Sequence, residues 1–122
     1  MGYPMANAEE MALTADEFRS IALSLPEAVE GAHMGHADFR VGGKIFASLG
    51  NPDASWAMVK LAPEDQALRI EAEPEAFEPA PGAWGRNGGT RMRLAAAGRQ
   101  TTLSALTAAW RNVAPKKLLA TH

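Results

Sequence analysis

The sequence contains no cysteine, and it lacks any long uninterrupted run of apolar residues. Without cysteine the chain can form neither disulfides nor thiolate metal sites, a usage that suits the reducing cytoplasm. No stretch approaches the roughly 18 apolar residues that a membrane-spanning helix requires. We therefore expect a cytoplasmic protein that is not inserted in a membrane.

The residues that are present are typical of one globular domain. The 122 residues are 47% hydrophobic, which is enough to build a single buried core. The opening "MGYPMANAEEM" has neither the basic segment nor the apolar segment of a secretion signal. We interpret residues 1–12 as a disordered leader or tag remnant and residues 13–122 as one domain.

Charge is divided unevenly along the chain, although the formal net charge is only −2. All 14 acidic residues precede Arg86. From that point on the cations are Arg86, Arg91, Arg93, Arg99, Arg111, Lys116 and Lys117. Either this basic part binds an anionic partner, or the two halves of the sequence pair across the fold. The pI near 5.9 stands against nucleic-acid binding, because such domains often exceed a pI of about 9.

The clearest predicted helix begins at Thr14, which can form a capping box with Glu17. Apolar residues then recur with the spacing of one buried helix face, at Phe18, Ile21, Ala22 and Leu25. Pro26 ends the pattern, because proline cannot continue a helix. We expect this helix to pack on the core.

The stretch "ADFRVGGKIFASLGN" predicts a β-hairpin. Its paired glycines suit a two-residue turn, in which positive φ is required. This register places Val41 opposite Lys44 and Phe39 opposite Phe46. The second strand is apolar on both faces, which is typical of a strand in the centre of a sheet.

Further strands are expected around residues 29–34, 56–61 and 90–94, with a short helix over 63–71. A final helix should begin at Thr101 or Thr102 and end at Pro115. Its buried face is predicted to be Leu103, Leu106, Trp110 and Val113. This order predicts an α+β fold in which an antiparallel sheet of about five strands is packed by helices.

The stretch "PAPGAWGRNGGTRMRL" combines glycines with three arginines. Its glycines match neither the dinucleotide pattern nor the phosphate loop, which would need a following lysine and hydroxyl residue. Strand alternation points Arg91 and Arg93 to one side, and Arg86 precedes them, so a cationic patch suited to phosphate is expected. Trp84 could stack on a base, but its neighbouring proline and glycine favour folding back over the sheet edge. The competing interpretation of the arginines is an ordinary solvated face.

Neither metal binding nor catalysis is predicted from local patterns. His33 and His36 lie three apart in what is expected to be strand and turn, so their rings should point apart, and His36 should bond the backbone in the turn. The serines at positions 48, 55 and 104 lack the context of an activated nucleophile. We expect no cofactor and no enzymatic activity.

Several motifs together resemble the MmcQ/YjbR family of small bacterial proteins. They are "ALSLP" followed by "GHADFRVGGKIF", then "PAPGAWGR", and finally "WRNVAPK", so the likeness spans residues 13–119. The resemblance implies a CyaY-like α+β fold, also described as a double wing, and a DNA-binding role. It supplies no catalytic residue. One departure is Gly89, where many relatives carry a tryptophan.

These observations lead to two functional hypotheses. In the first, a monomer binds duplex DNA without catalysis, through Lys44, Trp84, Arg86, Arg91, Arg93, Lys116 and Lys117. In the second, the chain is a module that binds a protein or a small acidic ligand with the Trp84 loop and the strand beside it. An enzymatic role has no local support.

Overall fold

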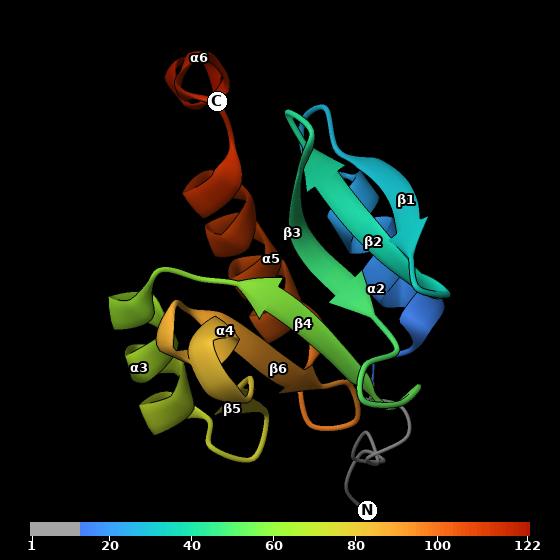
Figure 1. Cartoon of the computed structure of the whole chain (residues 1–122), viewed down its shortest axis with the longest axis vertical. Helices are drawn as coiled ribbons and strands as arrows, with labels where there is room; N and C mark the ends of the chain where they lie inside the picture. Colours follow the sequence, from blue (N-terminus) through green and yellow to red (C-terminus); the bar gives the residue numbers. More distant parts are fainter. Residues whose placement is uncertain (1–12) are drawn as a thin grey trace, which may run out of the picture.

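The computed structural model describes residues 13–122, and Figure 1 shows a sheet with helices packed against it. The interpretation of residues 1–12 as a leader lies outside the described residues. The strands are β1 (Val29–His33), β2 (His36–Val41), β3 (Lys44–Leu49), β4 (Trp56–Lys60), β5 (Phe77–Pro79) and β6 (Gly89–Arg93). The helices are α2 (Ala15–Leu23), α3 (Pro63–Ala72), α4 (Gly82–Arg86), α5 (Arg99–Val113) and α6 (Lys116–Thr121).

The six strands form one antiparallel sheet in the order β1-β2-β3-β4-β6-β5. Helices α2 and α5 lie behind it in the view of Figure 1. The predicted α+β fold is confirmed, and β3 is a central strand as expected. The additional strand is β5, a three-residue strand with Pro79 in a proline-rich stretch, where sequence patterns favour a loop.

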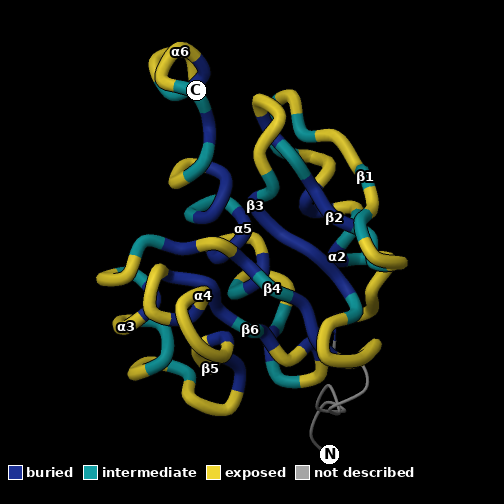
Figure 2. The backbone as a smooth tube through the Cα atoms, viewed as in Figure 1, coloured by how far each residue is buried: buried dark blue, intermediate teal, exposed yellow. Residues whose placement is uncertain are grey.

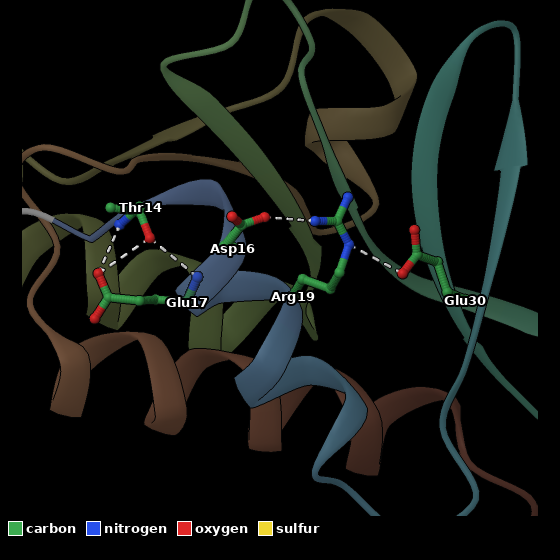
Figure 3. A network of polar contacts seen from close by, with 5 residues as sticks. All are labelled: Thr14, Asp16, Glu17, Arg19 and Glu30. Carbon is green, nitrogen blue, oxygen red and sulfur yellow. Dashed lines mark hydrogen bonds and ion pairs between the residues drawn. The ribbon is translucent and has the colours of Figure 1, made fainter.

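Helix α2 begins as predicted. The Thr14 hydroxyl accepts a hydrogen bond from the Glu17 N–H at 3.1 Å, and the Glu17 carboxylate accepts one from the Thr14 N–H, also at 3.1 Å. The same helix is joined to the sheet by Arg19, whose guanidinium contacts Asp16 at 2.8 Å and Glu30 of β1 at 3.0 Å (Figure 3). Two acidic side chains of the first half are thereby matched by a cation of that same half.

The core lies between the sheet and the pair α2 and α5, where the tube in Figure 2 is largely dark blue. Phe18 of α2 packs on Phe39 of β2 with ring centroids 5.9 Å apart. Trp110 of α5 is buried, and its indole N–H donates to the Pro26 carbonyl at 2.9 Å. This hydrogen bond ties the C-terminal half of α5 to the end of the α2 segment.

The buried face of α5 agrees in part with the predicted one, because Leu106 and Trp110 are buried and Val113 packs against the core, whereas Leu103 does not. Leu103 is 47% exposed, and the buried residues are Thr102, Ala105, Leu106, Ala109 and Trp110. The sequence-based prediction placed only the large apolar side chains of this helix toward the core. The helix instead places two alanines inward, which lets its backbone approach the sheet closely.

The β2–β3 hairpin has the predicted turn, with φ of 57° at Gly42 and 80° at Gly43. Val41 pairs with Lys44 as expected, but Phe39 pairs with Ala47 and not with Phe46. A β-bulge between Phe39 and Arg40 causes the shift. Because the bulge adds a residue to β3, both Phe46 and Ala47 are buried.

Candidate anion-binding face

One face of the sheet carries α2 and α5, and the opposite face carries the short helix α4 at one side (Figure 1). A row of cross-strand partners on this second face consists of Asp38, Ser48, Met58, Arg91 and Glu78. Partners in such a row point to the same side of a sheet. Any ligand that contacts the middle of the sheet must approach from this side, because the helices fill the other.

Strand β6 presents its arginines to this face. Thr90, Met92 and Leu94 are buried, as alternation predicts, whereas Arg91 and Arg93 point outward. The Arg93 guanidinium lies 4.2 Å from the ring centroid of Trp56, a cation–π contact. Arg93 is therefore held at the end of β6 that is remote from α4, while Arg91 lies at the centre of the strand.

An acidic group accompanies Arg93. Asp53 accepts hydrogen bonds from the Ser55 hydroxyl at 2.5 Å and from the Ser55 N–H at 2.8 Å. The hydroxyl bond, then the backbone bond, and to a smaller extent the charge of Arg93 hold the pKa of Asp53 below its ordinary value. Asp53 thus stays ionised at neutral pH and opposes anion binding at this end of the face.

The glycine-rich stretch folds as α4 followed by a tight return into β6. Gly88 has φ of +105°, and a Cβ there would lie 1.8 Å from the Leu61 carbonyl oxygen, so a larger residue does not fit. Buried Gln66 of α3 donates from Nε2 to the carbonyls of Gly85 at 2.9 Å and Gly89 at 3.0 Å. The glycines therefore fix this loop against the end of β4 and do not form a phosphate cradle.

Trp84 does not fold over the sheet edge as expected; the residue is 59% exposed. The reason is that α4 turns Gly85 inward, where a Cβ would lie 1.8 Å from the Ala80 carbonyl oxygen, and so turns Trp84 outward. The backbone of Trp84 lies on Gly89, and Gly89 pairs with Lys60. The exposed Trp84 is therefore attached beside the end of β4 that carries Lys60.

Strands β3 and β4 pair only from Ala47–Val59 to Leu49–Ala57 and diverge beyond. Asn112 of α5 reaches into the divergence and donates from Nδ2 to the Lys60 carbonyl at 2.9 Å. The remaining space is an open groove of about 490 Å³, lined by Arg40, Gly43, Lys44, Ile45, Lys60, Asn112 and Val113. Three of these residues are cationic and none is acidic.

The site predicted from sequence does not include Arg40, Lys60 or Asn112. Arg40 and Lys60 belong to the acidic part of the sequence, so the uneven distribution of charge along the chain does not predict a cationic site at these residues. Lys60 did carry a local signal, because a lysine that ends an apolar strand can turn its charge toward an exposed face. The contribution of Asn112 depends on how α5 meets the sheet, which no local pattern reports.

The predicted lysines at the chain end are brought near the hairpin. A Cβ at Gly42 would lie 2.6 Å from Pro115 Cγ, so the hairpin tip touches the residue before α6. Lys44 follows that tip, and Lys116 and Lys117 open α6. They follow the end of α5 at Val113 and begin a new short helix after Pro115. All three side chains are exposed.

A charged cluster adjoins the groove on β1 and β2. Asp38 is fully buried beneath Arg40 and His33; Arg40 donates to it at 2.7 and 3.0 Å, and His33 Nδ1 lies 2.7 Å from it. The Arg40 hydrogen bond holds the pKa of Asp38 below its ordinary value despite burial, and the His33 contact adds to the effect. Gly31 leaves room for the cluster, since a Cβ there would lie 2.9 Å from Asp38 Oδ1.

The histidines also differ from expectation. His33 and His36 flank the β1–β2 turn and are cross-strand partners, so they lie on the same side of the hairpin. His36 is the first residue of β2, and its ring lies against Gly50. Across residues 13–122 there is no group of three or more acidic, histidine or cysteine residues placed to bind a metal ion. None of the helices in that range has the length and apolar character to span a membrane.

Most of the late cations are not matched by acidic groups. Within residues 13–122, carboxylates pair with Arg19, His33, Arg40, Arg69 and Arg99. No described carboxylate lies within 4.0 Å of the remaining cations, which are Lys44, Lys60, Arg86, Arg91, Arg93, Arg111, Lys116 and Lys117. Among these ion pairs of the described residues, one joins the two differently charged parts of the sequence, the contact of Arg99 with Glu17 at 3.2 Å. We define the basic face as Lys44, Lys60, Trp84, Arg86 and Arg91.

Comparisons with known proteins agree with this fold. Residues 23–112 match the family described as YjbR. A crystal structure of the Deinococcus radiodurans protein DR2400, which carries a DUF419 domain, is similar with a TM-score of 0.65 at 18% sequence identity. The similarity covers 87% of this chain and 80% of that one, and at this identity it shows the fold alone. No curated protein matches the chain.

Proposed function

The chain belongs to the YjbR family, and from its basic face we propose that it binds DNA through the phosphate backbone without catalysing a reaction. The observation that supports this proposal is that Lys44, Lys60, Arg86 and Arg91 form no ion pair with any carboxylate of the described residues. Cations without such partners can form charge-assisted hydrogen bonds with phosphate oxygens, and guanidinium groups can form two at once.

The neighbouring residues set the extent of the proposed contact. Glu78 is the cross-strand partner of Arg91, and Asp53 lies near Arg93, so the contact region ends at these carboxylates. On the other side it continues past the groove to Lys116 and Lys117 beside the hairpin tip. Arg93 then contributes less than the sequence predicted, because its guanidinium already lies on Trp56.

Replacing Lys60 with glutamine tests this arrangement. We expect Lys60→Gln to weaken the binding of a short labelled duplex about fivefold, because one surface charge contact is worth up to about 1 kcal/mol. The slope of log affinity against log salt concentration should also fall by about one, since one phosphate contact is lost. Fluorescence anisotropy titrations at several salt concentrations measure both quantities.

Arg99→Gln is the matched control. It removes the same charge from the opposite side of the molecule, where Arg99 contacts Glu17 at 3.2 Å with both side chains largely exposed. Its duplex affinity and salt slope should equal those of the wild type. Equal affinities and slopes for Lys60→Gln and wild type would contradict the assignment of this face, and no binding by any of the three proteins to the duplex or to its separated strands would contradict DNA binding itself.

The groove favours a second candidate, the binding of a small anion. Its volume of about 490 Å³ lies within the usual range of small-molecule pockets, and its lining is cationic. A thermal-shift screen with nucleotides, polyphosphates and dicarboxylates distinguishes the two functions. Stabilisation by a small anion that Lys60→Gln abolishes, without binding of duplex or single-stranded DNA by the wild type, would favour the second candidate.

A further inference from the structure

Trp84 is unusual because a rigid backbone holds it in an exposed position. Trp84 is 59% exposed, while the loop around it is fixed by the buried Gln66 amide and by the close approach of Gly88 to Leu61. A large apolar ring on a fixed loop loses little conformational entropy when it contacts a ligand. This is the situation of an aromatic contact residue in a binding site.

The surroundings of the ring identify what it would contact. Gly89 lies beneath Trp84 and pairs with Lys60, which lines the cationic groove, and Arg86 lies two residues further along α4. The same small area therefore offers one flat π surface and several cations. A ligand that satisfies both must combine a planar ring with negatively charged groups at short spacing.

From this combination we infer that the basic face prefers single-stranded nucleic acid, with one base stacked on Trp84 and the adjoining phosphates in the groove of Arg40, Lys44 and Lys60. Exposed aromatic rings beside a cationic track are how single strands are bound without sequence readout. In a duplex every internal base is already stacked and paired, so its face is not available to an indole outside the helix. The inference rests on the proposed DNA binding and specifies its substrate.

The size of the groove agrees with this assignment. A space of about 490 Å³ is open to solvent between diverging strands and accommodates a short piece of flexible backbone, whereas a rigid duplex would span the face from outside. Asn112 closes the floor by donating to the Lys60 carbonyl at 2.9 Å. The Arg40 guanidinium, already bonded to Asp38, is positioned at the wall of the groove.

Binding of oligothymidylate, of a duplex of equal length and of an abasic strand of equal length tests the inference. We expect the wild type to bind oligothymidylate at least about fivefold more tightly than the duplex, because base stacking on an aromatic residue contributes that much or more. The abasic strand retains the phosphates and lacks the bases, so it should bind weakly. An oligouridylate arm shows whether RNA is accepted as well as DNA.

Trp84→Ala should weaken oligothymidylate binding about fivefold to a hundredfold and leave duplex binding unchanged. Trp84→Phe should retain most of the single-strand affinity. Leu68→Ala is the matched control, because Leu68 is also an exposed large apolar residue, 65% exposed on α3. Quenching of tryptophan fluorescence by the oligonucleotide, lost in Trp84→Ala, is a second readout.

The outcomes separate the two proposals. Duplex binding equal to or tighter than single-strand binding would overturn the single-strand preference while leaving DNA binding intact. A preference that persists unchanged in Trp84→Ala would overturn the role of the indole. Absence of binding to every nucleic acid would overturn both proposals together. Circular dichroism of each variant establishes that it is folded. We expect Trp84→Ala to be folded because Trp84 contributes little to the core.

Discussion

Asp38 is a buried carboxylate whose environment is determined by two neighbouring side chains. Its carboxylate is fully buried, yet the groups that cover it, Arg40 and His33, are themselves 35% and 37% exposed. The acid is therefore shielded from water by its own hydrogen-bond partners, at the surface of the sheet. The same contacts fix the Arg40 guanidinium at the groove, so the cluster positions a cation as well as satisfying an anion.

The lowered pKa of Asp38 makes stability depend on pH in a defined direction. The folded form binds the proton less readily than the unfolded chain, whose pKa is near the ordinary value of 3.8. The stabilisation is therefore fully present above that value and is lost as pH falls through the lowered pKa of the folded state. Acid unfolding should begin in this window.

Asp38→Asn should lower the free energy of unfolding by about 1–3 kcal/mol at neutral pH, because charged hydrogen bonds are lost. The difference from wild type should shrink at about pH 3, because the carboxyl of the unfolded chain, with its ordinary pKa of 3.8, is mostly protonated there. Urea denaturation at the two pH values measures it, with the exposed Asp16→Asn as control. A difference that is the same at both pH values would show that the carboxylate charge is not involved.

At the residue level, sequence predicted orientation where local alternation determines it and failed where a distant contact does. Arg91 and Arg93 point outward as expected, because neighbouring residues on a strand must alternate. Trp84 was assigned to the wrong environment, since its exposure depends on Gly85 approaching Ala80. The two histidines were wrongly expected to point apart, because the turn between them proved to be only two residues long.

Among the elements, the return from α4 into β6 depends most strictly on one residue type. At Gly88 both the positive φ and the adjacent Leu61 carbonyl exclude a side chain. Movement of this return would displace Trp84 and Arg86 together, because both belong to α4. The geometry of the basic face is therefore sensitive to a position that itself contacts no ligand.

Gly88→Ala should lower the free energy of unfolding by about 2–4 kcal/mol, combining backbone strain with an overpacked contact. Binding of the preferred nucleic acid should weaken as well. Gly98→Ala is the control, since Gly98 has no positive φ and no atom within 4 Å of an added Cβ. Thermal unfolding and anisotropy of both variants provide the comparison, and equal stability of the two would refute the clash.

Elements that are specified by local sequence signals were predicted correctly, whereas elements that depend on contacts between distant residues were not. The capping box of α2 and the paired glycines of the β2–β3 turn are local signals, and both structures form as expected. The bulge in β3 was missed because alternation gives no sign of an inserted residue when both faces are apolar. Strand β5 and helix α4 were missed because they are short and lie among prolines.

For the whole molecule, one core connects the sheet with α2 and α5, and its residues range from Leu13 to Leu118. Removing a large side chain from it should therefore destabilise the entire fold and not one element. Leu106→Ala should cost about 2–5 kcal/mol in unfolding free energy, because Leu106 is fully buried in α5.

Leu103→Ala on the same helix should change stability by no more than about 0.5 kcal/mol, since Leu103 is 47% exposed. Tryptophan fluorescence and far-UV circular dichroism should report the same unfolding transition in all three proteins. Similar losses in the two variants would restore the helix face expected from sequence.

The overall fold class was accessible from sequence because helix, strand and turn signals occur in an order that admits few architectures. The basic face was only partly accessible. The division of charge identified Arg86 and Arg91, but the groove requires β3 and β4 to diverge and α5 to reach between them. Such an arrangement is a property of packing, and the residues that form it are separated along the chain.

The two hydrogen bonds of Gln66 have a kinetic consequence. One buried amide holds the carbonyls of Gly85 and Gly89, so the loop cannot release one end without disturbing the other. The contact surface is then assembled before any ligand arrives. Association should be limited by diffusion and charge steering, without a slow rearrangement step, and stopped-flow traces should be single exponentials whose rates rise linearly with ligand concentration.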